Sequence, residues 1–152
     1  MNKKIREQLV QKAMEAAANS YAPYSKFHVG AALLAAAQPA GIPRRKRSGS
    51  IADRQHVIIS GANIENASYG LTICAERAAL ASAITAGYRR FKAIAVVVSG
   101  KKPVGPCGAC LQALAEFCRP DLIVLVAAAA RPDKIIIYKL RDLLPHTFRF
   151  RP

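Results

Sequence analysis

Two short motifs of this sequence contain residue types that bind metals and move protons. Residues 74–76 read Cys-Ala-Glu, and residues 106–110 read Pro-Cys-Gly-Ala-Cys. Cys107 and Cys110 are three residues apart, so on one helical turn they face the same side. If the strands that lead into the two motifs are neighbours in a sheet, Cys74 joins this pair and three thiolates surround one point. Thiolates are zinc ligands, and three protein ligands leave the fourth tetrahedral position open for water, which is typical of a catalytic site.

Glu76 and Arg77 follow Cys74 directly and would supply proton transfer and hydrogen bonds at such a site. Glu76 lies two residues after a ligand, and we expect it to carry protons between metal-bound water and a substrate. Three thiolates make zinc a weaker acid. We expect the positive ends of two helix dipoles and hydrogen bonds from Arg77 to offset this effect. The simpler alternative for Glu76 and Arg77 is a solvated position on a helix surface.

The four cysteines also have a simpler interpretation as buried thiols without a metal. Glu76 and Pro106 accompany three of them in the motifs and favour the metal site. Cys118 has no partner motif, and we expect it to pack in the core. The first residues lack the apolar run of a secretory signal. We therefore expect a cytoplasmic protein whose cysteines bind metal rather than form disulfides.

The hydrophobic pattern predicts an α/β fold in which both motifs open helices. Apolar residues at helical spacing and β-branched runs predict the following order. Helices are expected over 3–19, 74–86, 107–117 and 140–144, and strands over 27–36, 56–62, 93–98, 122–127 and 135–138. Strands that alternate with helices indicate a sheet with helices on both faces. The length of 152 residues fits one domain over 1–152, with an extended basic loop at about 37–55.

Composition adds an unusually large positive charge. Apolar residues make up 52% and charged residues 21%, which excludes collagen, a disordered tail and a coiled coil. The 23 Lys and Arg against 9 Asp and Glu give a net charge of +14, which is compatible with a nucleic-acid partner. The basic run at 44–47 is most often a solvated loop, but it also resembles a nuclear-localisation patch and could attract phosphates. No apolar stretch reaches about 18 residues, so no membrane span is expected.

The combination of C-x-E with P-C-x-x-C resembles the zinc-dependent nucleobase deaminases. Beyond these motifs, the sequence is similar to the homotetrameric cytidine deaminases that act on free nucleosides. Three further blocks carry this resemblance over nearly the whole chain. Residues 21–33 read Tyr-Ala-Pro-Tyr-Ser-Lys-Phe-His-Val-Gly-Ala-Ala-Leu, residues 61–70 read Gly-Ala-Asn-Ile-Glu-Asn-Ala-Ser-Tyr-Gly, and residues 143–148 read Leu-Leu-Pro-His-Thr-Phe.

The resemblance implies a three-layer α/β fold of the cytidine deaminase type, with a mixed five-stranded sheet between helices. It implies a cytoplasmic hydrolase of pyrimidine salvage that deaminates cytidine and deoxycytidine to uridine and deoxyuridine by zinc-activated hydroxide. It also implies one zinc ion per chain and a homotetramer whose subunits share active sites.

The resemblance further implies roles for the residues of the two motifs. Cys74, Cys107 and Cys110 would hold the zinc. Glu76 would protonate N3 of the pyrimidine and later the leaving amino group, and the backbone of Ala75 would meet the pyrimidine edge.

Asn63 and Glu65 are implied to bind the ribose 3′-hydroxyl. Two residues that are two apart on an extended segment point the same way. Together, an amide and a carboxylate can donate to and accept from one hydroxyl group. The alternative is that both residues only stabilise a turn.

Three aromatic residues are implied to complete the site. Phe27 would pack on the base, Phe148 would reach into a neighbour's active site, and Tyr69 would help to line an intersubunit site. Ordinary packing is the alternative for each of them. The sequence departs from the family at Leu111, where arginine is common, and in the longer loop at 37–55.

Two other functions compete with nucleoside deamination. A deaminase of polynucleotide cytosine, or of another aminopyrimidine such as a blasticidin-type compound, would explain the +14 charge. However, polynucleotide editors usually carry histidine as the first ligand and lack the blocks around Asn63 and Phe148. A nucleic-acid-binding zinc module without activity needs four ligands, and the spacing supplies only three. We therefore expect a pyrimidine nucleoside as the substrate.

Overall fold

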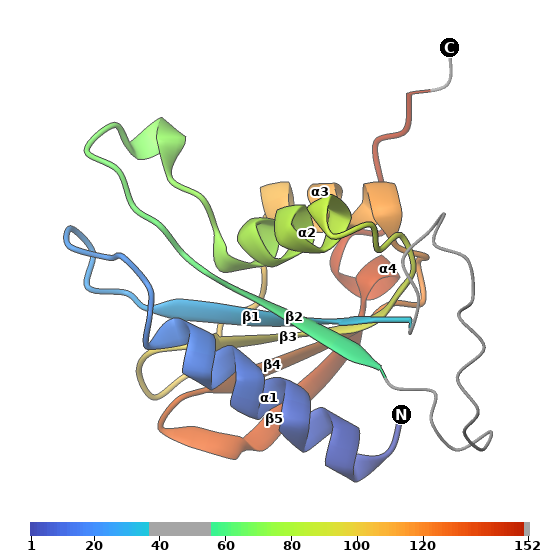
Figure 1. Cartoon of the computed structure of the whole chain (residues 1–152), viewed down its shortest axis with the longest axis horizontal. Helices are drawn as coiled ribbons and strands as arrows, with labels where there is room; N and C mark the ends of the chain where they lie inside the picture. The colour runs from blue at the N-terminus through green and yellow to red at the C-terminus, as the bar shows by residue number, and fades with distance from the viewer. Residues whose placement is uncertain (37–55, 151–152) are drawn as a thin grey trace.

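The computed structural model describes residues 1–36 and 56–150, which form a five-stranded sheet between helices (Figure 1). The strand order is β2-β1-β3-β4-β5; β3 and β4 are parallel, and the other neighbouring pairs are antiparallel. The mixed sheet that the resemblance implied is thus confirmed. The elements are α1 (Lys3–Ala17), β1 (Val29–Ala35), β2 (Val57–Ala62), the 3-10 helix η1 (Tyr69–Leu71), α2 (Ala75–Thr85), β3 (Phe91–Val98), α3 (Gly108–Phe117), β4 (Ile123–Ala128), β5 (Arg131–Lys139) and α4 (Leu140–Leu143).

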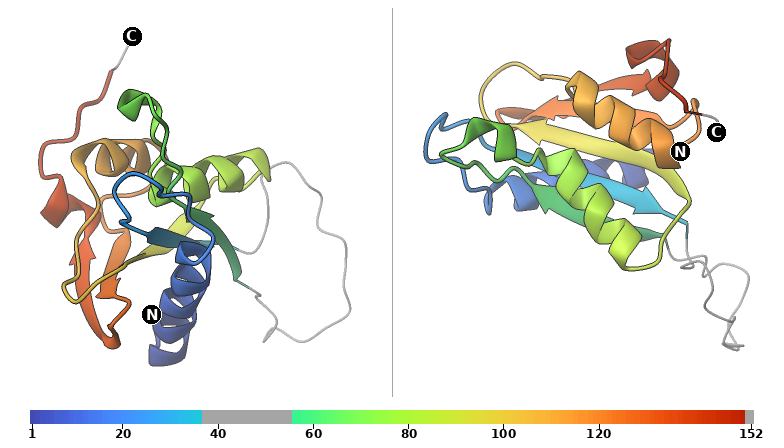
Figure 2. Two further views of the ribbon diagram at one scale, coloured as in Figure 1. Left: turned by 90° about the vertical axis from the view of Figure 1, so that its left-hand side faces the viewer. Right: turned by 90° about the horizontal axis from the view of Figure 1, so that it is seen from above.

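The helices cover the sheet from two sides. Figures 1 and 2 show α1 on one face and α2, α3 and α4 on the other. The side chains of β1 alternate between these layers, since Leu34 packs with α1 whereas Leu33 packs under α2 and α3. The central strands are therefore buried on both faces, which explains the continuous apolar runs in their sequences.

The predicted elements agree with the structure except at some of their ends. The clearest difference is β5, which begins at Arg131 although only 135–138 was predicted. β5 is an edge strand, where proline and charged side chains are tolerated, so residues such as Pro132 and Lys134 hid its first half. The predicted loop at 37–55, with the basic run at 44–47, lies outside the described residues.

The condition that the strands before the two motifs are neighbours is not met, although the motifs still come together. The strands before the two helices are β2 and β3, and β1 lies between them. The helices still meet, because α2 packs across β2 and β1 and lies beside α3 (Figure 2). An excursion over residues 63–74, which contains η1, carries the chain from β2 back to the start of α2.

Gly61 allows α2 to lie directly on β2. A Cβ atom at this position would overlap the backbone of Ala75 and Ala79. The absence of a side chain therefore fixes how closely the first turn of α2 approaches the sheet. That turn begins directly after Cys74, so this close approach also sets the position of the first motif. Within the described residues, no helix is long and apolar enough to cross a membrane.

Candidate active site

The three predicted metal ligands come together at the starts of two helices. Cys74 is the N-cap residue of α2, Cys107 is the N-cap residue of α3, and Cys110 lies in the first turn of α3. Their Sγ atoms all lie within 4.8 Å of one another. Helix N-termini present unpaired N–H groups and the positive end of the helix dipole, which stabilise thiolates. The two helices therefore gather three sulfur atoms beside free N–H groups, although burial and the nearby charges of Glu76 and Cys74 raise the pKa of the Cys110 thiol.

This donor set fits one zinc ion. Sulfur ligands at about 2.3 Å from a tetrahedral zinc ion are about 3.8 Å apart, which is within the spread of the three Sγ atoms. Among the described residues, this group contains no fourth histidine, cysteine, aspartate or glutamate. Cys107 is exposed and Cys110 is buried, so the cluster spans the boundary between core and solvent. Three sulfur ligands at such a boundary leave a fourth position that water can reach.

Local hydrogen bonds favour thiolate at Cys107. Partial burial of Cys107 opposes ionisation, but hydrogen bonds from the backbone of Cys110 and Ala109 and from neighbouring thiols lower its pKa below the usual range. Arg77 adds positive charge beside Cys74, with Nη2 3.9 Å from the Sγ atom of Cys74. The same Nη2 donates to the carbonyl oxygen of Thr72 at 2.8 Å, which holds the guanidinium in place. Arg77 thus lies where the sequence predicted a donor to a thiolate.

Glu76 is a buried carboxyl group next to the sulfur cluster. Its side chain is only 4% exposed, and burial raises its pKa above the usual value for glutamate. Ala75, which precedes it, is fully buried against the sheet. Residues this deep in the first turn of a packed helix have little freedom, so the carboxyl group is held in one place.

A cavity of about 290 Å³ lies beside the sulfur cluster, and several of the other predicted residues line it. Its walls come from the loop before β1, the chain that follows β2, the start of α2, strand β3 and the loop that leads to α3. The predicted residues that line it are Phe27, Asn63, Glu65, Cys74, Ala75, Glu76 and Cys107. Apolar walls with a few polar groups at each end are typical of a small-molecule site.

Asn63 and Glu65, which also line the cavity, hold the backbone of the loop before β1. The amide of Asn63 accepts from the N–H of Val29 at 2.8 Å and donates to the carbonyl of Phe27 at 2.9 Å. The carboxylate of Glu65 accepts hydrogen bonds from the backbone and hydroxyl of Ser25 and from the backbone of Tyr24. These bonds leave each side chain with unused capacity, because an amide has two N–H donors and a carboxylate has about four acceptor sites.

Comparison with known proteins decides the family. The family model for the cytidine and deoxycytidylate deaminase zinc-binding region matches residues 42–126. A cytidine deaminase of Halalkalibacterium halodurans is 49% identical over 143 residues, which cover 94% of this chain and 93% of that protein. This chain belongs to the cytidine deaminase family.

Two other cytidine deaminases support this assignment. The protein of Sporosarcina psychrophila is 43% identical over 118 residues, which cover 78% of this chain and 74% of that protein. The crystal structure of cytidine deaminase from Burkholderia pseudomallei has a TM-score of 0.75 and 37% identity, and it covers 97% of this chain and all of that chain. The expected fold, enzyme class and zinc cofactor are thereby confirmed: this family member is a zinc-dependent hydrolytic deaminase.

Two of the aromatic residues implied by the resemblance to cytidine deaminases do not line the cavity of their own chain. Tyr69 is 74% exposed and touches Tyr24 edge to face, with the ring centroids 6.1 Å apart. Phe148 is 73% exposed, and its backbone is held on α3 by two hydrogen bonds with the side chain of Gln112. Both rings therefore point into solvent in the isolated chain.

Sequence reasoning missed several residues of the deaminase cavity. Ser25, Thr72, Val104 and Gly105 line it without having been assigned a role. The only signal for Ser25 was its place in the block at 21–33 that resembles the family. Leu111, where the sequence departs from the family, lies on α3 with its side chain buried in the core, and it is not among the residues that line the cavity.

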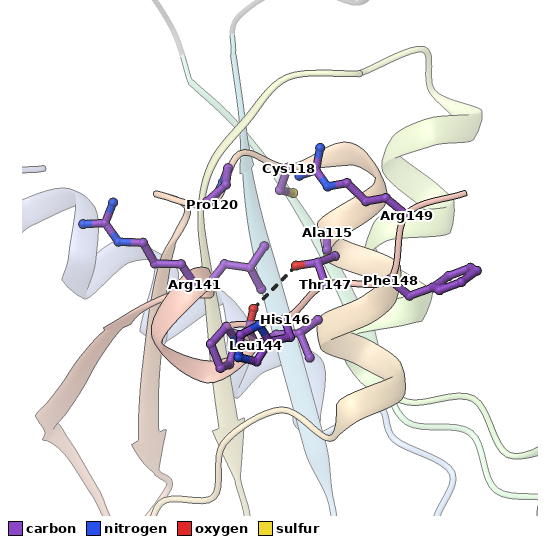
Figure 3. A pocket seen from close by; sticks show the side chains of 11 residues that line it. Ala115, Cys118, Pro120, Arg141, Leu144, His146, Thr147, Phe148 and Arg149 are labelled. Carbon is purple, nitrogen blue, oxygen red and sulfur yellow. Dashed lines mark hydrogen bonds between the residues drawn. The ribbon is translucent and has the colours of Figure 1, made fainter. Parts of the chain in front are cut away.

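A second and larger hollow of about 650 Å³ lies between α3, α4 and the C-terminal segment (Figure 3). Arg141, His146 and Arg149 contribute to its lining. Figure 3 shows the two arginine side chains extending at opposite ends of the hollow, so their guanidinium groups do not converge on a common point. Among the described residues, the group of side chains suited to hold a metal lies elsewhere, at Cys74, Cys107 and Cys110.

Proposed function

We propose that this cytidine deaminase family member hydrolyses cytidine and deoxycytidine to uridine and deoxyuridine in pyrimidine salvage. Water replaces the amino group at C4 of the pyrimidine, and ammonia is released. The observation that carries the proposal is one cavity lined by thiols of the sulfur cluster, by the buried carboxyl group of Glu76 and by the polar side chains of Asn63 and Glu65. A nucleoside needs both kinds of group, one set for the reacting ring and another for the sugar hydroxyls.

The chemistry belongs to the end with the sulfur cluster. Cys74, Cys107 and Cys110 would hold zinc, which when bound supplies water activated for attack at neutral pH. Glu76 takes one proton from the attacking water and delivers it to N3 of the pyrimidine. It then takes the remaining proton of the hydroxyl group now on C4 and delivers it to the amino group, which leaves as ammonia while the C4 carbonyl forms. Arg77 donates toward the Sγ atom of Cys74 and lowers the negative charge of the three thiolates.

Recognition of the sugar belongs to the opposite end. After its bond to the Phe27 carbonyl, the amide of Asn63 keeps one free N–H donor. After its bonds to residues 24 and 25, the carboxylate of Glu65 keeps one acceptor site on Oε1. One hydroxyl group can accept from the first and donate to the second. This pairing supports Asn63 and Glu65 as ligands of the ribose 3′-hydroxyl.

The base lies between these two ends in the proposal. The ring of Phe27, which lines the cavity, packs on one face of the pyrimidine. The backbone of Ala75 meets the pyrimidine edge at the start of α2, where helix N–H groups are free to donate. Val96 and Val98 of β3 form an apolar wall that excludes water.

We also propose a homotetramer in which subunits complete each other's sites. Exposure of Tyr69 and Phe148 supports this, because both rings lie outside the cavity of their own chain. Further exposed apolar side chains lie before β1 and between β2 and α2, namely Tyr21, Tyr24, Ile64, Leu71 and Ile73. Analytical ultracentrifugation tests the proposal: the mass of four chains supports it, and a monomer that turns over cytidine at the full rate contradicts it.

The single domain over 1–152 and the cytoplasmic location are parts of the same proposal. The described strands form one continuous sheet, which supports a single domain. A reducing compartment suits three cysteines that must stay free to bind metal.

A deaminase of polynucleotide cytosine is the second candidate, because the net charge is +14. A parallel assay with cytidine, deoxycytidine and a cytosine-containing single strand separates the two. Uridine and deoxyuridine formation without turnover of the strand supports the nucleoside deaminase. Turnover of the strand alone supports the second candidate.

A further inference from the structure

The backbone of Phe27 is held on both sides by residues of the sugar end. Its N–H donates to the Oγ atom of Ser25 at 3.0 Å, and its carbonyl accepts from Nδ2 of Asn63 at 2.9 Å. The Oδ1 atom of Asn63 also accepts from the N–H of Val29 at 2.8 Å, two residues further on. Because both polar backbone groups of Phe27 are fixed, the start of its side chain is fixed as well.

Ser25 connects these hydrogen bonds around Phe27 to the carboxylate of Glu65. The hydroxyl of Ser25 donates to Oε1 of Glu65 while its oxygen accepts from the N–H of Phe27. The backbone N–H groups of Tyr24 and Ser25 donate to Oε2 of the same carboxylate, at 2.9 and 3.2 Å. Ser25 is therefore the link in a chain of hydrogen bonds that leads from Glu65 to Phe27.

The residue between Ser25 and Phe27 has an uncommon backbone conformation. Lys26 has a φ of 56°, and within the described residues it is the only non-glycine residue with a positive φ. A side chain other than glycine in this region costs free energy unless surrounding contacts impose it. The N–H of Lys26 donates to the carbonyl of Ala22 at 3.1 Å, which closes the turn. The strained turn thus depends on the bonds that Ser25 makes on either side of it.

We propose that Ser25 is a positioning residue that couples the sugar-binding carboxylate of Glu65 to the base-packing ring of Phe27. The inference rests on the proposed nucleoside deamination and concerns how the same cavity recognises its substrate. When a sugar hydroxyl binds to Glu65, the carboxylate that holds Ser25 becomes less mobile, and the turn that carries Phe27 is held more firmly. The hydrogen bonds of Ser25 go to Glu65 and Phe27, and none of them reaches the sulfur cluster or Glu76. Loss of its hydroxyl therefore weakens substrate binding rather than chemistry.

The test compares Ser25→Ala with Ser25→Thr, which keeps the hydroxyl, and with Ser82→Ala, a matched change at an exposed serine on α2. We expect Ser25→Ala to raise the KM for cytidine by about tenfold, the effect of one hydrogen bond, while kcat changes by less than about twofold. Ser25→Thr should return KM to within about threefold of the wild type, and Ser82→Ala should change neither constant. Should the alanine variant fail to fold, Ser25→Cys removes most of the hydrogen bonding in a side chain of similar shape.

A substrate without the 3′-hydroxyl tests the coupling itself. The wild-type protein should have a much higher KM for 2′,3′-dideoxycytidine than for deoxycytidine, because one hydroxyl contact is missing. If Ser25 transmits that contact to Phe27, the ratio of the two KM values should fall in Ser25→Ala by about threefold or more. Titration of the product uridine by calorimetry gives a second measurement without turnover. Its dissociation constant should rise in Ser25→Ala by about the same factor as KM.

The outcomes separate this inference from the proposed function. If the wild-type protein turns over cytidine but Ser25→Ala leaves KM and the substrate ratio unchanged, the coupling is wrong and the function stands. An equal fall of kcat and kcat/KM, with KM unchanged, also overturns the positioning role. If the zinc-loaded wild-type protein does not turn over cytidine, the proposed function fails and the inference fails with it.

Discussion

The two ends of the cavity are built in different ways. The end with the sulfur cluster stands on the first turns of α2 and α3, where Ala75 and Cys110 are fully buried and Glu76 nearly so. At the sugar end Asn63 is also buried, but the turn at residues 24–27 is exposed and is held by hydrogen bonds from Ser25 to Glu65, a residue 40 positions away in sequence. The carboxyl group that moves protons is thus packed into the core, whereas the loop that carries Ser25 and Phe27 lies at the surface. Changes at the first end should alter turnover and metal content, and changes at the second should alter KM.

The largest expected effect is at Glu76. Glu76→Gln keeps the shape of the side chain but removes the group that moves protons, so kcat should fall by about 10³-fold or more with KM nearly unchanged. Zinc content, measured by atomic absorption on the same sample, should remain that of the wild type. Glu116→Gln, at an exposed position on α3, is the matched control and should retain full activity. Normal turnover by Glu76→Gln would exclude this carboxyl group from the reaction.

The next effect is the coupled loss of metal and stability at Cys107. Cys107→Ala leaves two thiolates, which bind zinc much more weakly, and zinc binding contributes to folding in such sites. We expect substoichiometric zinc, loss of activity and a lower melting temperature by calorimetry. The control is Cys118→Ala, since Cys118 is buried away from the cluster and burial raises its pKa to about 12. That control should keep its zinc, and stoichiometric zinc in Cys107→Ala would contradict a site of three thiolates.

Gly61 tests whether the packing of α2 sets the position of the sulfur cluster. Gly61→Ala places a Cβ atom against the backbone of Ala75 and Ala79, and we expect a loss of about 2–3 kcal/mol in the free energy of unfolding. The shift of α2 should also reduce zinc affinity, measured by competition with a chelator. A Cβ atom at Gly70 meets nothing within 4 Å, so Gly70→Ala is expected to leave both quantities unchanged. If Gly61→Ala had the same free energy of unfolding as the wild type, α2 could move away from β2 without loss of stability, and the close packing would not set the position of the cluster.

The smallest expected effect is a shift, in Ser25→Ala, of the pH at which the KM for cytidine begins to rise. The hydrogen bond from Ser25, together with those from the backbone of Tyr24 and Ser25, lowers the pKa of Glu65 below its usual value. The carboxylate therefore stays ionised as the pH falls, and the KM for cytidine should begin to rise only at a pH below the usual glutamate pKa. In Ser25→Ala the pKa returns toward the usual value, so the rise should begin at higher pH. Identical KM profiles in the two proteins would contradict this assignment.

The parts of the molecule that follow simple patterns were predictable from sequence. The helix that follows Cys74 has strong helix formers and ends before Gly87, whose φ of 87° is typical of a helix C-terminus. The motif spacing predicted that Cys74, Cys107 and Cys110 would gather, because metal ligation restricts both residue type and position. Local sequence rules of this kind do not depend on contacts with distant segments of the chain.

Contacts between distant segments were not predictable in the same way. No local signal shows that Ser25 reaches Glu65 or that Asn63 holds the loop at Phe27, since these bonds depend on where β1 and β2 pair. The order of the strands was another such case, because β1 separates the strands that precede the two motif helices. The beginning of β5 was hidden because an edge strand tolerates residues that are otherwise typical of loops.

The most direct test of the account relates turnover to bound zinc in the wild-type protein. Samples depleted of zinc to different degrees, with zinc quantified in each, are assayed for uridine formation from cytidine. We predict an initial rate that increases in proportion to bound zinc, reaches its maximum at about one ion per chain and extrapolates to zero without metal. A rate that persists in zinc-free protein, or fully zinc-loaded protein that forms no uridine, would contradict the account.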